Sequence, residues 1–305
     1  MTTGLVLRAR SGFYTIATAE GDLVEARLRG RMKRDRQASD LAVIGDRVTV
    51  ERLPDGTGAI DTVEPRQGRF SRRQPGPRGS WREDVIVANP DLVAVVFSVD
   101  RPPPNPRLID RFLVVAEYND VPVLLVANKV DLVEVNAARA LFGPYEQIGY
   151  HVLYASARAD IGLEELRAGL AGKLAIVTGP SGVGKSTLLN ALQPGLQLVT
   201  GEVSEAESGK GKHTTSHAEL HPLDGPAGGY VADTPGVREL GLWQIPSTEL
   251  ASCFPEFRPY LGACAFNDCT HLHEPRCGLR AAVQDGAVSE ARYDSYRRLM
   301  TGDLA

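Results

Sequence analysis

The sequence GPSGVGKS at residues 179–186 decides the fold of this chain of 305 residues. It matches the pattern G-x-x-x-x-G-K-[ST], follows the apolar run Leu174–Thr178 and precedes the helical stretch Thr187–Leu192. Glycines allow backbone N–H groups to curl around phosphates, and the following helix adds the positive end of its dipole. A chance glycine turn would not explain the strand and helix on either side. We predict a phosphate-binding loop in which Lys185 neutralises phosphate charge and the Ser186 hydroxyl ligates Mg²⁺.

Two further apolar runs precede the loop and indicate the type of sheet. Leu92–Val99 and Val121–Ala127 are continuous and rich in β-branched residues, which is typical of parallel strands buried on both faces. The helical stretch Pro106–Tyr118 lies between them. Strands that alternate with helices predict a doubly wound α/β domain.

A motif for guanine follows the second run. Asn128–Asp131 reads NKVD, a weak match alone that becomes specific beside a phosphate-binding loop. The Asp131 carboxylate can accept hydrogen bonds from N1–H and the 2-amino group of guanine. Adenine offers neither group, so we expect the site to select GTP over ATP. Ser156 and Ala157 follow the apolar Val152–Tyr154, where a backbone N–H would meet the guanine oxygen.

A third motif, DTPG at Asp233–Gly236, follows the apolar Tyr230–Ala232. It has the D-x-x-G form that holds Mg²⁺ through water and contacts the γ-phosphate through the glycine backbone; a simple Pro-Gly turn is the alternative. The motifs stand in the order NKVD, P-loop, DTPG, whereas Ras-type GTPases begin with the P-loop. A parallel sheet tolerates such a circular permutation because its termini can be joined and a surface loop opened.

The first part of the chain is basic, although the whole chain has a net charge of −4. Residues 1–82 hold 16 basic and 10 acidic side chains, so this part carries +6 and the remainder −10. Its short β segments, separated by turn residues, predict a small barrel of the OB type. These segments are Gly12–Ala17, Leu23–Leu28, Arg47–Glu51 and Ala59–Val63.

The basic side chains favour RNA as the partner of this barrel, because RNA binding rests on phosphate neutralisation. A solvated charged loop is the usual alternative. Phe13 and Tyr14 are the main aromatic candidates, too few for a rich stacking platform. We therefore expect shape and backbone contacts on folded RNA rather than base stacking. The clustered cations are Arg27, Arg29, Arg31, Lys33, Arg34, Arg36, Arg66, Arg69, Arg72 and Arg73.

Three of the four cysteines fall in one short C-terminal segment together with a histidine. The set is Cys264, Cys269, His271 and Cys277. Three thiolates and one imidazole form a closed, structural zinc arrangement, which would organise a segment too short to build its own core. The spacing is not that of a C-x₂-C knuckle, so scattered buried thiols are the alternative. Cys253 lies outside the cluster, and we prefer His271 to the competing His273.

The composition excludes several other classes of protein. The 43% of apolar and 24% of charged residues are typical of globular domains. Four cysteines are too few for a disulfide scaffold, which indicates a reducing cytoplasm. No apolar run approaches the roughly 18 residues of a membrane helix, and the N-terminus lacks the apolar core of a secretory signal. We therefore expect no membrane partner.

In these motifs the chain resembles the ribosome-small-subunit-dependent GTPases, a family of circularly permuted bacterial GTPases. The resemblance implies zinc at the four Cys/His positions and binding to the small ribosomal subunit and its rRNA late in subunit maturation. It also implies hydrolysis of GTP to GDP and phosphate, stimulated by the subunit and coupled to release. Besides the nucleotide motifs and the Cys/His cluster, it includes Arg29–Arg34, Ile44–Asp46, Asn89–Asp91, Gly209–Thr215, Asp233–Leu240 and Phe254–Phe257.

Hydrolysis requires a group that positions the attacking water. Val237 stands where Ras-type enzymes have the Gln that orients water, so intrinsic turnover should be slow. Gly209–Thr215 resembles the family's first switch, in which Thr214 or Thr215 would supply a second hydroxyl to Mg²⁺. His213 would position water when the switch is ordered, and an exposed loop histidine is the open alternative. If hydrolysis is incidental, the chain is instead a nucleotide-dependent rRNA-binding module.

The sequence therefore predicts a multi-domain GTPase. We expect an OB-type barrel at residues 1–75, a linker at 76–83, a circularly permuted GTPase domain at 84–242 and a helical zinc-binding domain at 243–305. We expect a cytoplasmic monomer that binds GTP or GDP with Mg²⁺. The expected catalytic residues are Lys185, His213, Thr214 and Thr215. The expected nucleotide-binding residues are Asn128, Lys129, Asp131, Ser156, Ala157, Gly179, Pro180, Ser181, Gly182, Val183, Gly184, Lys185, Ser186, Thr187, Asp233 and Gly236.

Overall fold

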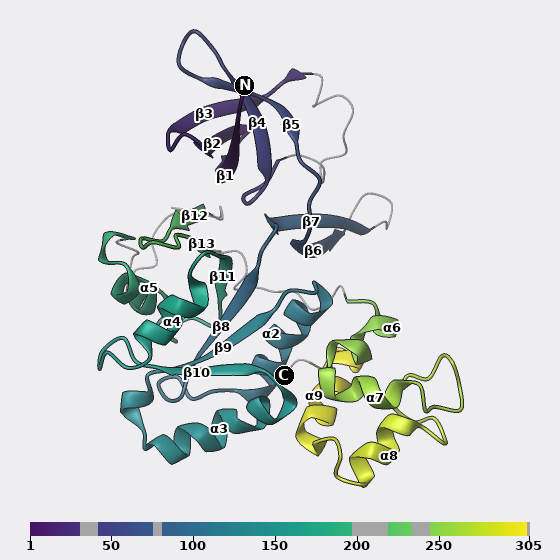
Figure 1. Ribbon diagram of the computed structural model, residues 1–305. Coiled ribbons are helices and arrows are strands. Elements are labelled where there is room, and N and C mark those ends of the chain that lie inside the picture. The colour runs from purple at the N-terminus through teal and green to yellow at the C-terminus, as the bar shows by residue number, and fades with distance from the viewer. Residues whose placement is uncertain (31–41, 76–80, 197–218, 234–244, 304–305) are drawn as a thin grey trace, which may run out of the picture.

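The computed structural model describes residues 1–30, 42–75, 81–196, 219–233 and 245–303. Three parts follow one another along the chain (Figure 1). A barrel lies at the top of the view, a sheet covered by helices lies below it, and a helical C-terminal part stands beside the sheet.

Five strands near the N-terminus close into a barrel. They are β1 (Thr2–Arg10), β2 (Phe13–Thr18), β3 (Leu23–Leu28), β4 (Arg47–Arg52) and β5 (Gly58–Val63). The order β1-β2-β3-β5-β4 returns to β1 through a β1–β4 ladder, and β3 pairs with β5 in parallel. Exposed and buried residues alternate along β3, as expected of a strand with one face inward. The predicted OB-type barrel is confirmed.

Tyr14 corrects one part of the sequence analysis. Its side chain is only 4% exposed and packs in the barrel core with Ile16 and Val24. Phe13, the next residue along β2, points outward and is 46% exposed. Because successive residues of a strand face opposite sides, only one of the two aromatic rings can meet RNA. Tyr14 is not a surface aromatic.

The central sheet has the strand order β10-β9-β8-β11-β13-β12. All neighbours pair in parallel except β12, which is antiparallel to β13. The strands are β8 (Leu92–Ser98), β9 (Val123–Asn128), β10 (His151–Ala155), β11 (Leu174–Thr178), β12 (Glu219–Pro222) and β13 (Tyr230–Asp233). β8 and β11 are buried along their whole length, as parallel strands covered on both faces should be.

Helices cover both faces of this sheet. Phe97 of β8 packs with α2 and α3, whereas its neighbour Val96 packs with α4 and α5 on the other face. The predicted doubly wound arrangement is confirmed. The helices are α2 (Pro106–Tyr118), α3 (Val135–Ile148), α4 (Leu163–Leu170) and α5 (Lys185–Leu192), with short 3₁₀ turns η3 (Val130–Leu132) and η4 (Pro194–Leu196).

The barrel joins the central sheet edge to edge. β12 pairs with β1 at Arg8 and Glu219, whose side chains also form an ion pair. The barrel also packs closely on Ala88, the last residue of the strand that leads into the sheet: Gly45 has a φ of +84°, and an added Cβ there would lie 2.1 Å from the Ala88 carbonyl oxygen. Backbone pairing and close backbone packing therefore both join the barrel to the rest of the chain.

A β-hairpin connects the barrel to the sheet. β6 (Arg69–Pro75) pairs antiparallel with β7 (Trp81–Ala88). Phe70 of β6 and Val87 of β7 are buried in the core shared with α2. Residues 81–83 of the predicted linker are therefore strand, while 76–80 lie outside the described residues. The limits of the domains stay a prediction.

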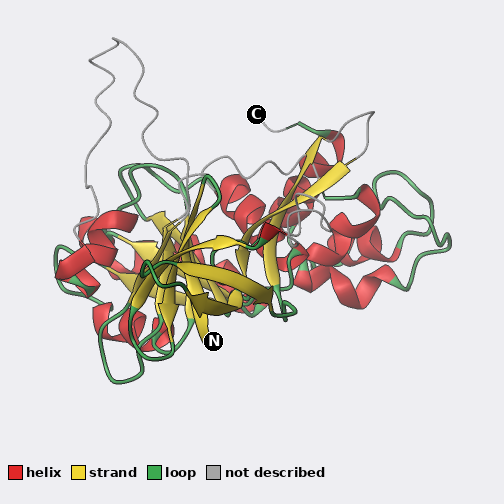
Figure 2. Cartoon of the chain, turned by 90° about the horizontal axis from the view of Figure 1, so that it is seen from above, coloured by secondary structure: helices red, strands yellow, loops and turns green. Residues whose placement is uncertain are grey.

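Short helices build the C-terminal part, which stands to one side of the strands (Figure 2). They pack around Phe254, Phe257 and Tyr296, and Val114 of α2 belongs to the same core. None of the helices in the described ranges has the length and apolar character of a membrane span. The elements are α6 (Ser247–Leu250), η6 (Ala251–Cys253), η7 (Pro255–Phe257), α7 (Arg258–Leu261), α8 (Gly278–Gln284) and α9 (Glu290–Thr301).

A buried arginine fastens this part to α2. Arg292 of α9 donates to Asp110 of α2 and to Glu256, each at 2.6 Å. Its side chain is 6% exposed and Asp110 is 2% exposed. Burial alone would lower the pKa of Arg292, but the attraction of Asp110 and Glu256 outweighs it and raises the pKa. Tyr145 of α3 also donates to Asp110, at 2.9 Å.

Replacing this arginine should destabilise the docked arrangement. Arg292→Met leaves two carboxylates without their cation, and the loss of one partner of a buried pair costs about 3–5 kcal/mol. Arg107→Met is the matched control, because Arg107 pairs with Asp294 at the surface, where a pair contributes about 1 kcal/mol or less. Urea unfolding, followed by circular dichroism, gives both free energies. Equal losses in the two variants would contradict the assignment.

Candidate functional site

The loop at residues 179–184 has a backbone that only glycine can follow at three places. It leaves the buried β11 and enters α5 at Lys185. Gly179, Gly182 and Gly184 have φ values of +138°, +78° and +96°. An added Cβ on Gly179 would lie 2.1 Å from the Val96 carbonyl oxygen. The loop is thus curled against β8, with its N–H groups and the N-terminus of α5 at one site, which is the geometry of an anion cradle.

The lysine of this loop folds back over it. The Lys185 ammonium donates to the carbonyls of Gly179 and Pro180 at 2.7 and 2.6 Å. Its positive charge is therefore held at the loop. Val183 is buried and anchors the loop in the core with α4 and α5, whereas Ser181 and Thr187 are exposed and Ser186 is half-buried.

The NKVD motif lies directly against this loop. Asn128, the last residue of β9, donates from Nδ2 to the Val183 carbonyl at 2.7 Å. Lys129 donates to the Gly182 carbonyl at 2.7 Å and also to the carbonyl of Arg101. The structure therefore brings together two motifs that are about 50 residues apart in the chain.

The aspartate of the motif meets the segment that follows β10. Ser156 Oγ donates to Asp131 Oδ1 at 2.5 Å and accepts from the Ala159 N–H at 3.1 Å. Ser156 is buried, while Asp131 is exposed and Ala157 half-exposed. This contact holds the Asp131 carboxylate against the segment that follows β10.

One atom of the site lacks a partner. Asn128 is 2% exposed, and its Oδ1 is a buried acceptor with no hydrogen bond to any of the described residues. Buried acceptors nearly always have a donor, so an orphaned one marks a place where a ligand or a moving segment completes the structure. It lies beside the phosphate loop, where a nucleotide is expected.

Several expected residues cannot be placed. His213, Thr214, Thr215 and Gly236 lie outside the described residues. The backbone of Asp233 is described and pairs with Val177 of β11, so Asp233 lies at the same edge of the sheet as the loop at residues 179–184. Their roles stay predictions.

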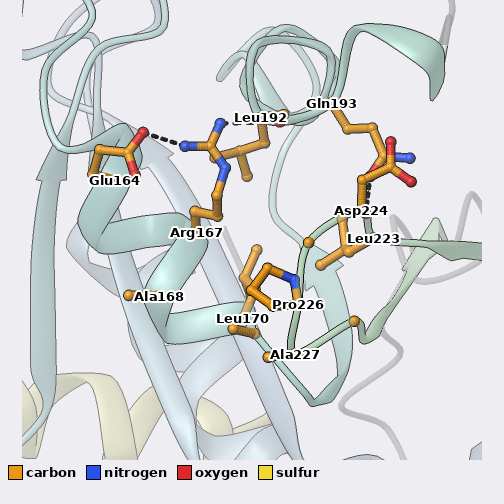
Figure 3. Close-up of a pocket in the computed structure, with 13 residues that line it drawn as sticks. Glu164, Arg167, Ala168, Leu170, Leu192, Gln193, Leu223, Asp224, Pro226 and Ala227 are labelled. Carbon is orange, nitrogen blue, oxygen red and sulfur yellow. Dashed lines mark hydrogen bonds and ion pairs between the residues drawn. The ribbon is translucent and has the colours of Figure 1, made fainter.

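One cavity of the described residues lies away from this edge. It has a volume of about 240 Å³ and lies between α4, the end of α5 and the turn after β12 (Figure 3). Arg167 closes it on one side by donating to the Leu192 carbonyl at 3.1 Å. The turn at Asp224–Gly228 precedes β13, so this cavity is near the amino ends of the strands, whereas ligands of parallel sheets bind at the carboxyl ends. This cavity is not part of the expected nucleotide site.

The four expected metal ligands form a compact cluster. All their ligand atoms lie within 4.8 Å of one another. His271 Nδ1 is 3.4 Å from the sulfurs of Cys264 and Cys277, which are 3.9 Å apart. A tetrahedral zinc with Zn–S near 2.3 Å and Zn–N near 2.0 Å requires separations of about 3.5–3.8 Å. Cys269 completes the set, and the cluster could hold a metal ion.

The surroundings of the cluster suit a metal. Burial lowers the pKa of His271, which keeps its imidazole neutral and able to coordinate. Burial also raises the pKa of the Cys269 thiol to about 12. A bound cation would lower this pKa again, because it stabilises the thiolate. Tyr293 donates to the His271 carbonyl at 2.6 Å. Cys253 donates to the Glu249 carbonyl at 3.3 Å and takes no part in the cluster.

The sequence analysis missed two residues that shape these sites. Arg101 presents its carbonyl to Lys129, and its Asp100–Pro104 loop ends the strand that precedes α2. Glu274 accepts backbone hydrogen bonds from Thr270, Leu272 and His273, which orders the turn around His271. Arg101 lies in a Pro-rich loop that follows a predicted strand, and this position could have indicated a role at the site. No feature of the sequence indicates the role of Glu274.

Comparison with known families identifies the chain. The RsgA GTPase family matches residues 63–243, and the RsgA N-terminal domain matches residues 3–60. The chain belongs to the RsgA GTPase family. Membership makes it a GTP-hydrolysing enzyme that uses GTP with Mg²⁺, and it confirms the resemblance stated from the motifs.

Two proteins named RsgA match this chain along nearly its whole length. A protein of Gemmatimonas aurantiaca named small ribosomal subunit biogenesis GTPase RsgA is 47% identical, over 98% of this chain and 96% of its own. One of the same name from Moorella thermoacetica is 42% identical, over 99% and 97%.

Two solved structures share the fold. The crystal structure of YjeQ from Thermotoga maritima superposes with a TM-score of 0.81 at 34% identity, over 100% of this chain and 99% of the other. YloQ, described as a circularly permuted GTPase, has a TM-score of 0.75 at 30% identity, over 99% and 94%. The permuted order of the motifs in this chain agrees with that description.

The phosphate loop of this RsgA GTPase should not tolerate a side chain at its first glycine. Gly179→Ala forces a Cβ into the backbone of β8 at a left-handed φ, and overpacking of this kind costs about 1–3 kcal/mol. We expect a lower melting temperature and weaker binding of a fluorescent GDP analogue. Gly195→Ala is the control, because an added Cβ there meets nothing within 4 Å. Unchanged nucleotide binding in Gly179→Ala would contradict the proposed cradle.

Proposed function

We propose that this chain is a GTPase of small-ribosomal-subunit maturation, and that the subunit stimulates hydrolysis and is released when it occurs. The observation that carries the nucleotide part is the contact of Asn128 and Lys129 with the phosphate loop. The small ribosomal subunit is proposed as the partner because it appears in the names of relatives that match nearly the whole chain. We further propose that the protein acts as a monomer in the cytoplasm.

Guanine selection is assigned to Asp131. Its carboxylate would accept hydrogen bonds from N1–H and the 2-amino group of the base, held in place by Ser156. Asn128 would border the base through its unpartnered oxygen. Ala157 would offer its backbone N–H to the guanine oxygen. An adenine has neither of these two donors and would form no such bonds with the carboxylate, which makes ATP a poor ligand.

Phosphate binding and hydrolysis are assigned to the loop and to the segments around it. Gly179–Gly184 would enclose the phosphates with backbone N–H groups, and Lys185 would move from the loop carbonyls to the phosphate oxygens. Ser186, Thr214 or Thr215 and Asp233 would hold Mg²⁺, which supplies charge neutralisation at the phosphates. His213 would position the attacking water, since Val237 cannot.

The first test measures GTP turnover with and without purified small ribosomal subunits. We expect slow turnover alone and at least about tenfold stimulation by subunits, because ordering of a water-positioning group by a partner raises hydrolysis strongly. His213→Ala should lose the stimulation and keep its affinity for GDP, whereas His151→Ala, an exposed site at the start of β10, should behave like the unchanged protein.

The outcomes separate the proposals. If subunits bind but do not stimulate the unchanged protein, the chain is a nucleotide-dependent rRNA-binding module with incidental hydrolysis. If His213→Ala retains full stimulation, His213 has no part in the mechanism and the partner supplies the group instead.

We also propose that the metal of the Cys/His cluster is structural zinc. Zinc in a Cys₃His set has no open coordination position, so Cys264, Cys269, His271 and Cys277 would hold the chain together rather than activate water. The observed separations of 3.4–3.9 Å suit that ion. The set links the turns that precede α8, where few apolar residues are available.

Elemental analysis of the purified protein tests the metal. We expect about one zinc per chain, because three thiolates and one imidazole fill a tetrahedral site. Cys269→Ser should lose most of the zinc and lower the melting temperature. Cys253→Ser, a buried cysteine outside the cluster, should keep the zinc. Correctly folded protein without metal, or equal zinc loss in both variants, would overturn the assignment.

A further inference from the structure

A row of three exposed side chains crosses the outer face of the barrel. Arg10 of β1 pairs in register with Phe13 of β2, and Phe13 pairs with Arg27 of β3. Directly opposite residues point to the same face of a sheet, so the aromatic ring lies between two cations. Phe13 is 46% exposed, and both arginines are exposed.

The ring and one cation already touch. The guanidinium carbon of Arg27 lies 4.1 Å from the centroid of the Phe13 ring, a cation–π contact. Arg8, Arg29 and Arg52 of the same barrel each pair with a carboxylate. Arg10 and Arg27, in contrast, form no ion pair with any residue in the described ranges.

The immediate surroundings leave the ring open. The β1–β2 turn beside it consists of Ser11 and Gly12, both exposed and small. The nearest carboxylate of the next row, Glu25, accepts a hydrogen bond from Thr15 at 2.5 Å and is directed along its own row. The Phe13 ring therefore presents an exposed apolar face flanked by two arginines that have no carboxylate partner among the described residues.

We propose that Arg10, Phe13 and Arg27 form a binding site for one unpaired RNA nucleotide, whose base stacks on the Phe13 ring. The site rests on the proposed function, since it names the RNA element that the barrel would contact. An aromatic ring accepts any base, and two cations on either side match the two phosphates that flank a nucleotide. Strands 2 and 3 form the oligonucleotide face of OB-type barrels.

This assignment differs from the expectation drawn from composition. A lack of aromatic residues pointed to backbone contacts alone, and Tyr14 is indeed lost to the core. A single ring between two arginines is nevertheless sufficient for one stacked base. The partner must therefore offer a looped-out or single-stranded nucleotide at this place, because a base within a duplex cannot reach the ring.

Binding by the full-length protein tests the site. The probes are a labelled 12-nucleotide single-stranded RNA and purified small subunits, each with a non-hydrolysable GTP analogue. We expect Phe13→Ala to weaken both affinities about 5- to 150-fold, the loss of one base–aromatic stack, without changing the salt dependence. Phe13→Trp should retain affinity. Arg27→Gln should reduce the slope of log affinity against log salt by about one phosphate contact.

Leu23→Ala is the matched control. Leu23 is 68% exposed on β3, at the other end of the β2–β3 ladder, so its loss removes apolar surface without touching the row. Equal effects of Phe13→Ala and Leu23→Ala would overturn the site, as would full affinity of Phe13→Ala. If the unchanged protein binds the RNA but not the subunit, the proposed function fails while the stacking site stands. If it binds neither, both fail.

Discussion

A buried hydrogen bond from Asn128 to the Val183 carbonyl joins the two halves of the proposed nucleotide site, which lie 55 residues apart in the chain. Lys129 adds a second link to the same loop. Both depend on the parallel order of β9, β8 and β11, which brings the carboxyl ends of three strands to one edge. Permutation of the motifs along the chain leaves this edge unchanged, because the order of strands in space, not in sequence, determines which loops meet.

The accessory parts are fastened to this domain by different physical means. β12 is the last strand of the central sheet on this side, and β1 of the barrel pairs with it at Arg8 and Glu219, so the barrel covers that end of the sheet edge. The C-terminal part is held through α2 by the buried Arg292–Asp110 pair. α2 in turn follows the loop whose Arg101 carbonyl contacts Lys129. The barrel and the C-terminal part therefore both contact the domain that holds the proposed nucleotide site.

In the barrel and in the Cys/His cluster, the backbone places three or four chemically matched side chains next to one another. In the barrel, strand register sets Arg10, Phe13 and Arg27 in one row on the outer face. In the cluster, a turn ordered by Glu274 brings His271 to within 3.4 Å of two sulfurs. Each arrangement stands on a packed core: the barrel core contains Ile16 and Val24, and the C-terminal core contains Phe254 and Tyr296.

The sequence by itself determined the elements that local chemistry controls. The start of α2 follows from Asn105, which caps the helix, and from Pro106, which suits its first position. The apolar run of β11 and its glycine-rich loop are equally local. Only the tertiary structure decided which of Phe13 and Tyr14 faces solvent, that residues 81–83 belong to a hairpin, and that Arg292 pairs with Asp110, 182 residues away. Which face of a strand is buried, and which residue pairs with a buried charge, depend on the elements that pack against them. Composition and residue spacing do not contain that information.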